Sequence, residues 1–107
     1  TVLVHQFCRI GGYTMVQGGT RTSMDVPPFV IAAREPVAYC GINLVGLRRR
    51  NFSTDLSSDI HNAYRIIYNS NLRIPEALQQ IRETITVGPE IQYIIDFVGD
   101  SRRGIIR

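Results

Sequence analysis

The hydrophobic positions at the start of the chain recur every six residues, at Val4, Ile10 and Val16. A period of six with a β-branched residue at each repeat is typical of hexapeptide β-helices, in which three short strands form one triangular coil. The pattern ends at the run Asp25-Val26-Pro27-Pro28-Phe29-Val30-Ile31. Residues 1–34 supply fewer than two coils, whereas a stable solenoid needs about three repeats or more. The pattern therefore predicts the last coils of a longer solenoid.

Beyond residue 34 the hydrophobic positions follow a helical period. A short first helix is predicted within residues 41–50. A second starts after Ser53, which is a good N-cap, and a third starts near Pro75, because proline suits the first turn of a helix. A fourth runs from about Glu90 to Val98. Each segment has one hydrophobic stripe, so we expect the helices to bury these stripes against one another and against the last coil.

Together these patterns predict terminal coils of a hexapeptide β-helix over residues 1–34, followed by a C-terminal α-helical domain of three to four helices over residues 35–107. A chain of 107 residues corresponds to about one domain. A fold of this size buries only about two-thirds of its unfolded surface, so a partner subunit would add stability. The hydrophobic runs are far shorter than the ~20 residues of a membrane-spanning helix, so we expect a soluble protein without stable membrane insertion.

The positive charge is carried by arginine alone and lies in the first half of the chain. Residues 1–53 contain six arginines and two acidic residues, a net charge of +4, whereas residues 54–107 contain six arginines and seven acidic residues, a net charge of −1. Arg48, Arg49 and Arg50 form the densest basic run. Because guanidinium groups bind phosphate oxygens in pairs, this run is a candidate phosphate site. A solvated helix end favoured by the helix dipole is the alternative interpretation.

Several other functional classes are disfavoured. No aromatic residues alternate with the arginine run and the rest of the chain is not basic, so we expect no nucleic-acid partner. The sequence contains no glycine-rich phosphate loop, no HExxH or GxSxG motif and no Cys/His metal spacing. Cys8 and Cys40 are too few for a disulfide framework, which suits a reducing cytoplasm, and we expect both to be small buried hydrophobic residues.

Two histidines are the remaining candidates for acid–base chemistry. His5, followed by Gln6, lies in the first hexapeptide, where side chains alternate between the interior and the outer faces of a coil. On an outer face its imidazole could orient or polarise a substrate. A solvated surface histidine is the alternative, because no nearby carboxylate completes a triad. His61 falls on the polar flank of the second predicted helix, so we interpret it as a surface residue.

Four segments of the chain closely resemble one protein family. They are His5-Gln6-Phe7-Cys8-Arg9-Ile10-Gly11, Asp25-Val26-Pro27-Pro28-Phe29-Val30-Ile31-Ala32, Asn43-Leu44-Val45-Gly46-Leu47-Arg48-Arg49-Arg50-Asn51-Phe52-Ser53 and Arg103-Gly104-Ile105-Ile106-Arg107. Along its whole length the chain resembles the C-terminal part of the acyl-carrier-protein:UDP-N-acetylglucosamine O-acyltransferases. Hexapeptide repeats occur in many acyltransferases, whereas the Asp-Val-Pro-Pro turn followed by the Asn and Gly-Leu-Arg-Arg-Arg segment is specific to this family.

The resemblance implies a cytoplasmic, homotrimeric enzyme with a left-handed parallel β-helix and a C-terminal helical domain. Such an enzyme moves a 3-hydroxyacyl group from acyl carrier protein to the 3-hydroxyl of UDP-N-acetylglucosamine, the first step of lipid A synthesis. No cofactor is implied beyond the phosphopantetheine arm of the carrier, which bears the acyl donor. The family's catalytic histidine lies on an earlier coil. The chain starts at Thr1, inside the hexapeptide pattern, so we expect these residues to lack that base and to be inactive alone.

The resemblance also implies which residues bind the substrates. His5 and Gln6 match positions that line the groove between subunits and touch the sugar and the acyl end of the product. Asn43 matches a nucleotide-recognition position. Arg49 and Arg50 match the pair that meets the diphosphate and the carrier's phosphopantetheine, a role that suits paired guanidinium groups.

Two departures from the family pattern bear on specificity. Gly18 matches the residue that gauges acyl length, but Gln17 stands where the best-known members have a second glycine. Because a glycine leaves the acyl channel open, Gly18 predicts a long rather than a short acyl chain. The acidic residue expected two positions after Asn43 is Val45, so we expect the uridine contacts to differ.

Two other functions stay open at this point. The chain could be a non-catalytic trimerising helical module, or it could belong to the related N-acyltransferase that acts later in the same pathway. Acyl transfer by the 107-residue chain alone would contradict a catalytic base on an earlier coil. Trials with O-unacylated and O-acylated nucleotide sugars would separate the two enzymes.

Overall fold

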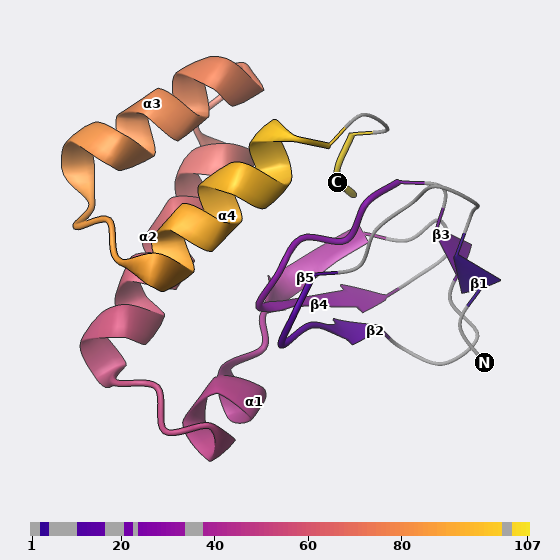
Figure 1. Cartoon of the computed structure of the whole chain (residues 1–107). Coiled ribbons are helices and arrows are strands. Elements are labelled where there is room, and N and C mark those ends of the chain that lie inside the picture. Colours follow the sequence, from indigo (N-terminus) through magenta and orange to yellow (C-terminus); the bar gives the residue numbers. More distant parts are fainter. Residues whose placement is uncertain (1–2, 5–10, 17–20, 23, 34–37, 102–103) are drawn as a thin grey trace.

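Short strands and helices form two adjacent parts of the molecule, as Figure 1 shows. The structure is a computed structural model that describes residues 3–4, 11–16, 21–22, 24–33, 38–101 and 104–107. Within these residues the strands lie on one side and three of the helices stack together on the other (Figure 1). No helix of the described ranges is long and apolar enough to cross a membrane.

Parallel pairing of short strands builds the first part. The strands are β1 (Leu3–Val4), β2 (Met15–Val16), β3 (Arg21–Thr22), β4 (Val30–Ala33) and β5 (Ala38–Ile42). β1 lies parallel to β3 with Leu3 opposite Arg21, an offset of 18 residues. β2 lies parallel to β4 with Met15 opposite Ile31, an offset of 16 residues. Three hexapeptides make one coil of 18 residues, so the six-residue pattern corresponds to stacked parallel coils.

The fifth strand leads from the coils to the helices. β5 pairs antiparallel with β4, with Val30 opposite Ile42. This pairing crosses the boundary predicted at residue 34, and the boundary itself stays a prediction. The predicted first helix is shorter than residues 41–50, because Gly41 and Ile42 belong to β5. Gly41 has a φ of +100°, a left-handed conformation that glycine adopts without steric cost and that no α-helix contains.

Four helices follow within the described residues, and local sequence signals explain where three of them begin. They are α1 (Leu44–Arg49), α2 (Thr54–Asn69), α3 (Ile74–Thr84) and α4 (Pro89–Gly99). The Ser53 hydroxyl caps α2 by accepting a hydrogen bond of 3.0 Å from the Leu56 N–H. Pro75 and Pro89 lie in the first turns of α3 and α4, where an N–H would have no helical partner. The predicted fold class, terminal coils followed by three to four helices, is confirmed.

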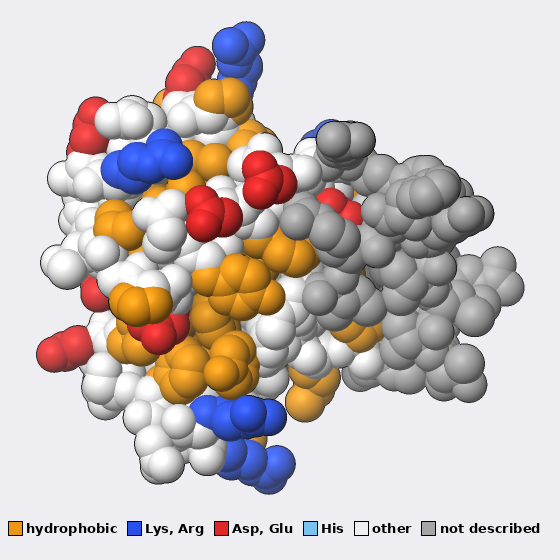
Figure 2. Space-filling model, in the orientation of Figure 1, with side chains coloured by type: hydrophobic (Ala, Val, Ile, Leu, Met, Phe, Trp, Pro, Cys, Tyr) orange, Lys and Arg blue, Asp and Glu red, His pale blue; other side chains and the backbone are white. Residues whose placement is uncertain are grey.

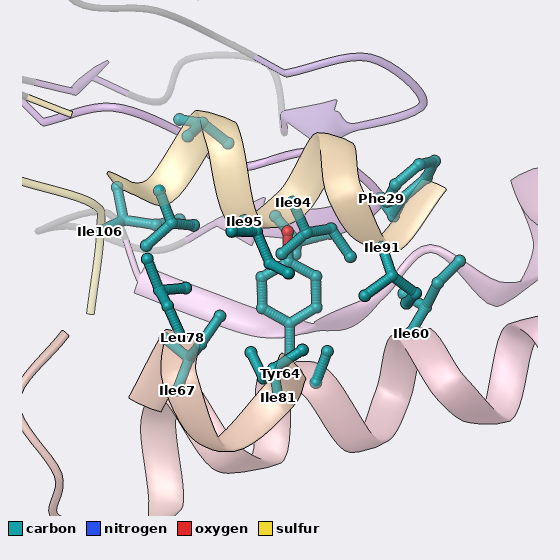
Figure 3. Packing of buried hydrophobic residues seen from close by; sticks show 14 of the residues in the cluster. Phe29, Ile60, Tyr64, Ile67, Leu78, Ile81, Ile91, Ile94, Ile95 and Ile106 are labelled. Carbon is teal, nitrogen blue, oxygen red and sulfur yellow. The ribbon is translucent and has the colours of Figure 1, made fainter. Parts of the chain in front are cut away.

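The hydrophobic core lies where α2, α3 and α4 meet the last coil. In Figure 3, Ile94 and Ile95 of α4 point toward Tyr64 of α2 and Ile81 of α3. These four side chains are almost completely inaccessible to solvent. Complete burial of one aliphatic side chain of this size stabilises a fold by about 1.5–3 kcal/mol. The helical stripes predicted from the sequence are therefore the surfaces that the helices bury.

Three tyrosines connect the helices to the strands. The rings of Tyr39 and Tyr68 stack with centroids 4.3 Å apart, and Tyr64 lies 5.8 Å from Tyr39. The Tyr64 hydroxyl donates a hydrogen bond of 2.5 Å to the Pro28 carbonyl, and the Tyr68 hydroxyl donates one of 2.6 Å to the Ile106 carbonyl. Burial raises the pKa of Tyr39, Tyr64 and Tyr68, because a phenolate would lose hydration there.

The last residues return to the coil and pair with it. Asp25 and Ile105 form a parallel bridge. The Asp25 N–H donates to the Gly104 carbonyl at 2.8 Å, and the Ile106 N–H donates to the Asp25 carbonyl at 2.9 Å. The Ser101 hydroxyl adds a hydrogen bond of 2.6 Å to the Asp25 carboxylate. Because Ile106 is also completely buried, its side chain is part of the hydrophobic core.

Raising the pH above about 10 is expected to destabilise the fold through Tyr64 and Tyr68. Burial raises the pKa of both phenols in the folded state, so the unfolded chain loses these protons first. Their contribution is therefore fully present below about pH 10 and is lost as the pH rises further. Urea unfolding at a series of pH values between about 8 and 11.5 measures this fall in the free energy of unfolding.

The variant carrying Tyr64→Phe and Tyr68→Phe separates ionisation from packing. It should be less stable than the parent at neutral pH by about 1–3 kcal/mol for each carbonyl left unpaired. Its free energy of unfolding should, however, fall less steeply above about pH 10, because both ionisable groups are gone. Parallel pH profiles for the two proteins would show that other groups cause the alkaline loss.

Candidate functional site

The residues predicted to bind substrates fall in two parts of the chain. His5, Gln6 and Gly18 lie outside the described residues, so substrate contact by His5 and Gln6 and acyl-length selection by Gly18 stay predictions. The other three predicted residues lie at the two ends of α1. Helix α1 and its surroundings therefore form the candidate site.

Asn43 joins the beginning of α1 to the coil. Its Oδ1 accepts a hydrogen bond of 3.2 Å from the Gly46 N–H and so caps the helix. Its Nδ2 donates one of 3.1 Å to the Tyr13 carbonyl, and its backbone N–H donates one of 2.7 Å to the Phe29 carbonyl. One amide hydrogen and one oxygen lone pair of this 9% exposed residue have no partner in the described part of the chain. Asn43 thus positions α1 and can still offer one hydrogen-bond donor and one acceptor to a ligand.

Gly46 leaves the space that this cap requires. A Cβ atom at Gly46 would lie 2.5 Å from Nδ2 of Asn43, a distance that real Cβ atoms essentially never show. Any larger residue would therefore displace the Asn43 amide from the helix and from the coil. The cap formed by Asn43 therefore requires a glycine three positions later, at Gly46.

Arg50 ends α1 and lies over an aromatic ring. Its guanidinium carbon is 5.2 Å from the centroid of the Tyr13 ring, a cation–π contact worth about 0.5–1 kcal/mol at an exposed site. Arg48, Arg49 and Arg50 are all exposed, and none of them forms an ion pair within the described residues. Figure 2 shows blue arginine side chains over α1, next to hydrophobic ones. These cations are free to bind an anionic ligand.

An aromatic cluster supports the ring beneath the guanidinium. Tyr13 stacks on Phe29 with centroids 5.4 Å apart and meets the edge of Phe52 at 5.3 Å. Tyr93 of α4 meets Phe29 at 5.8 Å, and its hydroxyl accepts a hydrogen bond of 2.7 Å from the Gly12 N–H. Phe29 of the coil and Phe52 of the loop before α2 therefore hold the Tyr13 ring directly, and Tyr93 of α4 supports it through Phe29.

The backbone of this cluster is unusual at two corners of the coil. Tyr13 has a φ of 58° and Phe29 a φ of 69°, although bulky residues seldom adopt left-handed conformations. Such a conformation costs on the order of 1–3 kcal/mol and persists only where surrounding contacts impose it. The two residues are separated by the same offset as β2 and β4, and the Phe29 N–H donates to the Gly12 carbonyl at 3.0 Å. Stacking of equivalent corners thus brings the two rings together.

A pocket of about 390 Å³ lies between α1 and the first half of α2, and we call it the α1–α2 pocket. It is lined by Ile42, Leu44, Arg48, Phe52, Thr54, Ser57, Ser58, His61 and Asn62. His61 is exposed, as predicted, but it also lines this pocket. The sequence contained a signal for this position in the pocket wall. Thr54, Ser58 and His61 are spaced three or four residues apart, and residues with this spacing share one face of a helix.

Metal binding has no support in the described part of the chain. No group of three or more His, Cys, Asp or Glu residues there could hold a metal ion. Cys40 is a free thiol and is half-buried, with its sulfur 3.6 Å from the Ala38 carbonyl, whereas Cys8 lies outside the described residues. The groups collected around α1 are guanidinium, amide and aromatic groups, which suit the binding of a phosphorylated ligand.

Comparison with curated proteins finds relatives along almost the whole chain. The acyl-[acyl-carrier-protein]–UDP-N-acetylglucosamine O-acyltransferase of Paraburkholderia phymatum is 44% identical over 108 residues, which cover 97% of this chain and 41% of the relative. The protein of the same name from Burkholderia mallei is 45% identical with the same coverage. The chain therefore spans about two-fifths of the length of the curated relatives it matches.

Solved structures show the same fold. A UDP-N-acetylglucosamine acyltransferase from Bacteroides fragilis 9343 superposes with a TM-score of 0.97 at 58% identity, covering 99% of this chain and 42% of that one. The homologous structure from Acinetobacter baumannii superposes with a TM-score of 0.94 at 37% identity, with 99% and 42% coverage. The family described as UDP-N-acetylglucosamine O-acyltransferase, domain 2, matches residues 25–106. On these matches, which include both ends of α1, the chain belongs to the UDP-N-acetylglucosamine O-acyltransferase family.

Proposed function

We infer that the chain is the substrate-holding C-terminal part of an acyltransferase that moves a 3-hydroxyacyl group from acyl carrier protein to the 3-hydroxyl of UDP-N-acetylglucosamine. The observation that carries this proposal is the family match over residues 25–106. The names of the curated relatives specify O-acylation, which favours this reaction over that of the related N-acyltransferase. In the reaction the sugar oxygen bonds to the acyl carbon, the thioester C–S bond breaks, and the carrier leaves as a thiol.

Arg49 and Arg50 are the residues proposed to bind the diphosphate of the nucleotide sugar and the phosphate of the carrier's phosphopantetheine. Their exposed guanidinium groups have no carboxylate partner in the described ranges, and Arg50 is oriented by the Tyr13 ring. Asn43 is proposed to contact the nucleotide with the hydrogen-bonding capacity that its capping role leaves unused. The proton of the sugar hydroxyl goes to a histidine on an earlier coil, with His5 and Gln6 in the same groove.

Assembly into a homotrimer in the cytoplasm is part of the proposal. Several large hydrophobic side chains near Asn43 are exposed, and an interface between subunits would remove them from water. They are Tyr13 at 43%, Met15 at 50% and Val45 at 58% exposure. Because Tyr13 also contacts Arg50, such an interface would lie beside the proposed phosphate site.

Replacing both Arg49 and Arg50 with alanine in the enzyme that contains this chain should raise the Michaelis constant for UDP-N-acetylglucosamine at least about tenfold, because charge-assisted hydrogen bonds to phosphate are lost. Steady-state kinetics with the carrier-bound donor at saturation measures the effect. The matched control is Arg82→Ala, an exposed arginine of α3, which should leave the Michaelis constant unchanged. An unchanged constant in the double variant would refute the phosphate assignment.

Removing the ring beneath Arg50 should weaken nucleotide-sugar binding without affecting turnover. Tyr13→Leu loses the cation–π contact, so its Michaelis constant should rise about two- to fivefold, whereas Tyr13→Phe keeps an aromatic face and should resemble the parent. The kinetic split between kcat and the Michaelis constant is the measurement. An equal rise in both variants would assign the effect to the hydroxyl group instead of the ring.

The 107-residue chain alone should not transfer acyl groups, because the proposed base lies on an earlier coil. A transfer assay with acyl carrier protein that bears a labelled acyl group tests this expectation. A mass measurement in solution reports the oligomeric state of the chain under the same conditions. Transfer by the isolated chain would contradict the proposed position of the base. Inactivity of the longer enzyme toward the O-unacylated and the O-acylated nucleotide sugar alike would favour the alternative of a non-catalytic trimerising module.

A further inference from the structure

The α1–α2 pocket is separate from the residues assigned to the nucleotide sugar. Arg49 and Arg50 do not line it, and the ring that Arg50 covers is not among its walls. Its volume of about 390 Å³ lies within the usual range of small-molecule sites, roughly 300–1,000 Å³. The α1–α2 pocket is therefore large enough to hold a small ligand other than the nucleotide sugar.

The walls of the pocket combine a hydrophobic floor with cationic and polar groups. Ile42, Leu44 and Phe52 supply the apolar surface, whereas Arg48 and His61 supply a guanidinium and an imidazole. No aspartate or glutamate lines the pocket. Arg48 also forms no ion pair within the described residues. Because Arg48 and His61 are basic and no acidic residue lines the pocket, it favours an anionic ligand over a cationic one.

Ser57 presents a polar group to the pocket from a buried position. The residue is only 8% exposed, and its hydroxyl makes no hydrogen bond in the part of the chain that the structure describes. No fully buried side-chain oxygen or nitrogen there lacks a partner, so the Ser57 oxygen is reached from the pocket that this residue lines. An accessible serine hydroxyl can donate a hydrogen bond to the anionic group of a ligand in the pocket.

We propose that the α1–α2 pocket binds a small amphipathic anion, with its apolar body on Ile42, Leu44 and Phe52 and its anionic group paired with Arg48, His61 and Ser57. A carboxylate and a phosphate monoester share this chemistry. The proposal goes beyond the proposed acyl transfer and does not rest on it, because none of the residues assigned to that reaction lines the pocket.

Calorimetric titration of the enzyme that contains this chain tests the proposal with 4-phenylbutyrate, phenyl phosphate, inorganic phosphate and the uncharged 4-phenylbutyramide. At least one of the two amphipathic anions should bind with a dissociation constant of about 1 mM or lower. The one that binds more tightly identifies the preferred anionic group. Binding by the amide as tight as by the anions, or by inorganic phosphate as tight as by phenyl phosphate, would overturn the proposal.

Variants locate the binding site. Arg48→Gln and Ser57→Ala should each weaken binding of the preferred anion, the former by about tenfold. Arg65→Gln, an exposed arginine of α2 outside the pocket, is the matched control and should leave binding unchanged. The variant with Arg49→Ala and Arg50→Ala should also bind normally, which separates this site from the nucleotide site. Loss of binding in that variant, or unchanged binding in Arg48→Gln, would refute the α1–α2 pocket as the site.

Discussion

The close stacking of two corners of the coil determines how the rest of the structure is arranged. The Gly11 N–H donates to the Val26 carbonyl at 2.7 Å, and the Phe29 N–H donates to the Gly12 carbonyl at 3.0 Å. The corners approach so closely that a Cβ atom at Gly11 would lie 2.3 Å from the Pro28 nitrogen. Only glycine fits there, because a side chain would collide with backbone that cannot move aside. Any substitution at Gly11 would separate the two corners.

Polar side chains from three different elements attach to these corners. Tyr64 of α2 reaches the Pro28 carbonyl, the Asn43 amide reaches the Tyr13 carbonyl, and the Tyr93 hydroxyl receives the Gly12 N–H. Backbone groups in a turn have no strand partner, so when they are buried a side chain must satisfy them. Hydrophobic burial is non-directional, whereas hydrogen bonds require a defined distance and angle. These directed hydrogen bonds define one position, and with it the position of α1 and its arginines.

The parts of the fold that follow local rules could be predicted from the sequence. Ser53, Pro75 and the hydrophobic stripes predicted α2, α3 and α4, because caps and helical periodicity involve neighbours within a few residues. The contacts of the candidate site could not be predicted in this way. Tyr93 contacts Gly12, which lies 81 positions away in the sequence, and Asn43 contacts Tyr13, which lies 30 positions away. A hydrophobic period describes only neighbours within a few residues, so it predicts neither contact. The α1–α2 pocket arises where separate elements of the fold pack together. The prediction for His61 considered only its place on one helix, so it did not include this pocket.

The bridge between Asp25 and Ile105 places the two ends of the family domain next to each other, since the matched region covers residues 25–106. The matched region therefore closes on itself, because its first residue belongs to the coil and its last residues return to that residue after the helices. A substitution that loosens Ile105 or Ile106 would therefore disturb the coil at Asp25, which lies far from them in the sequence.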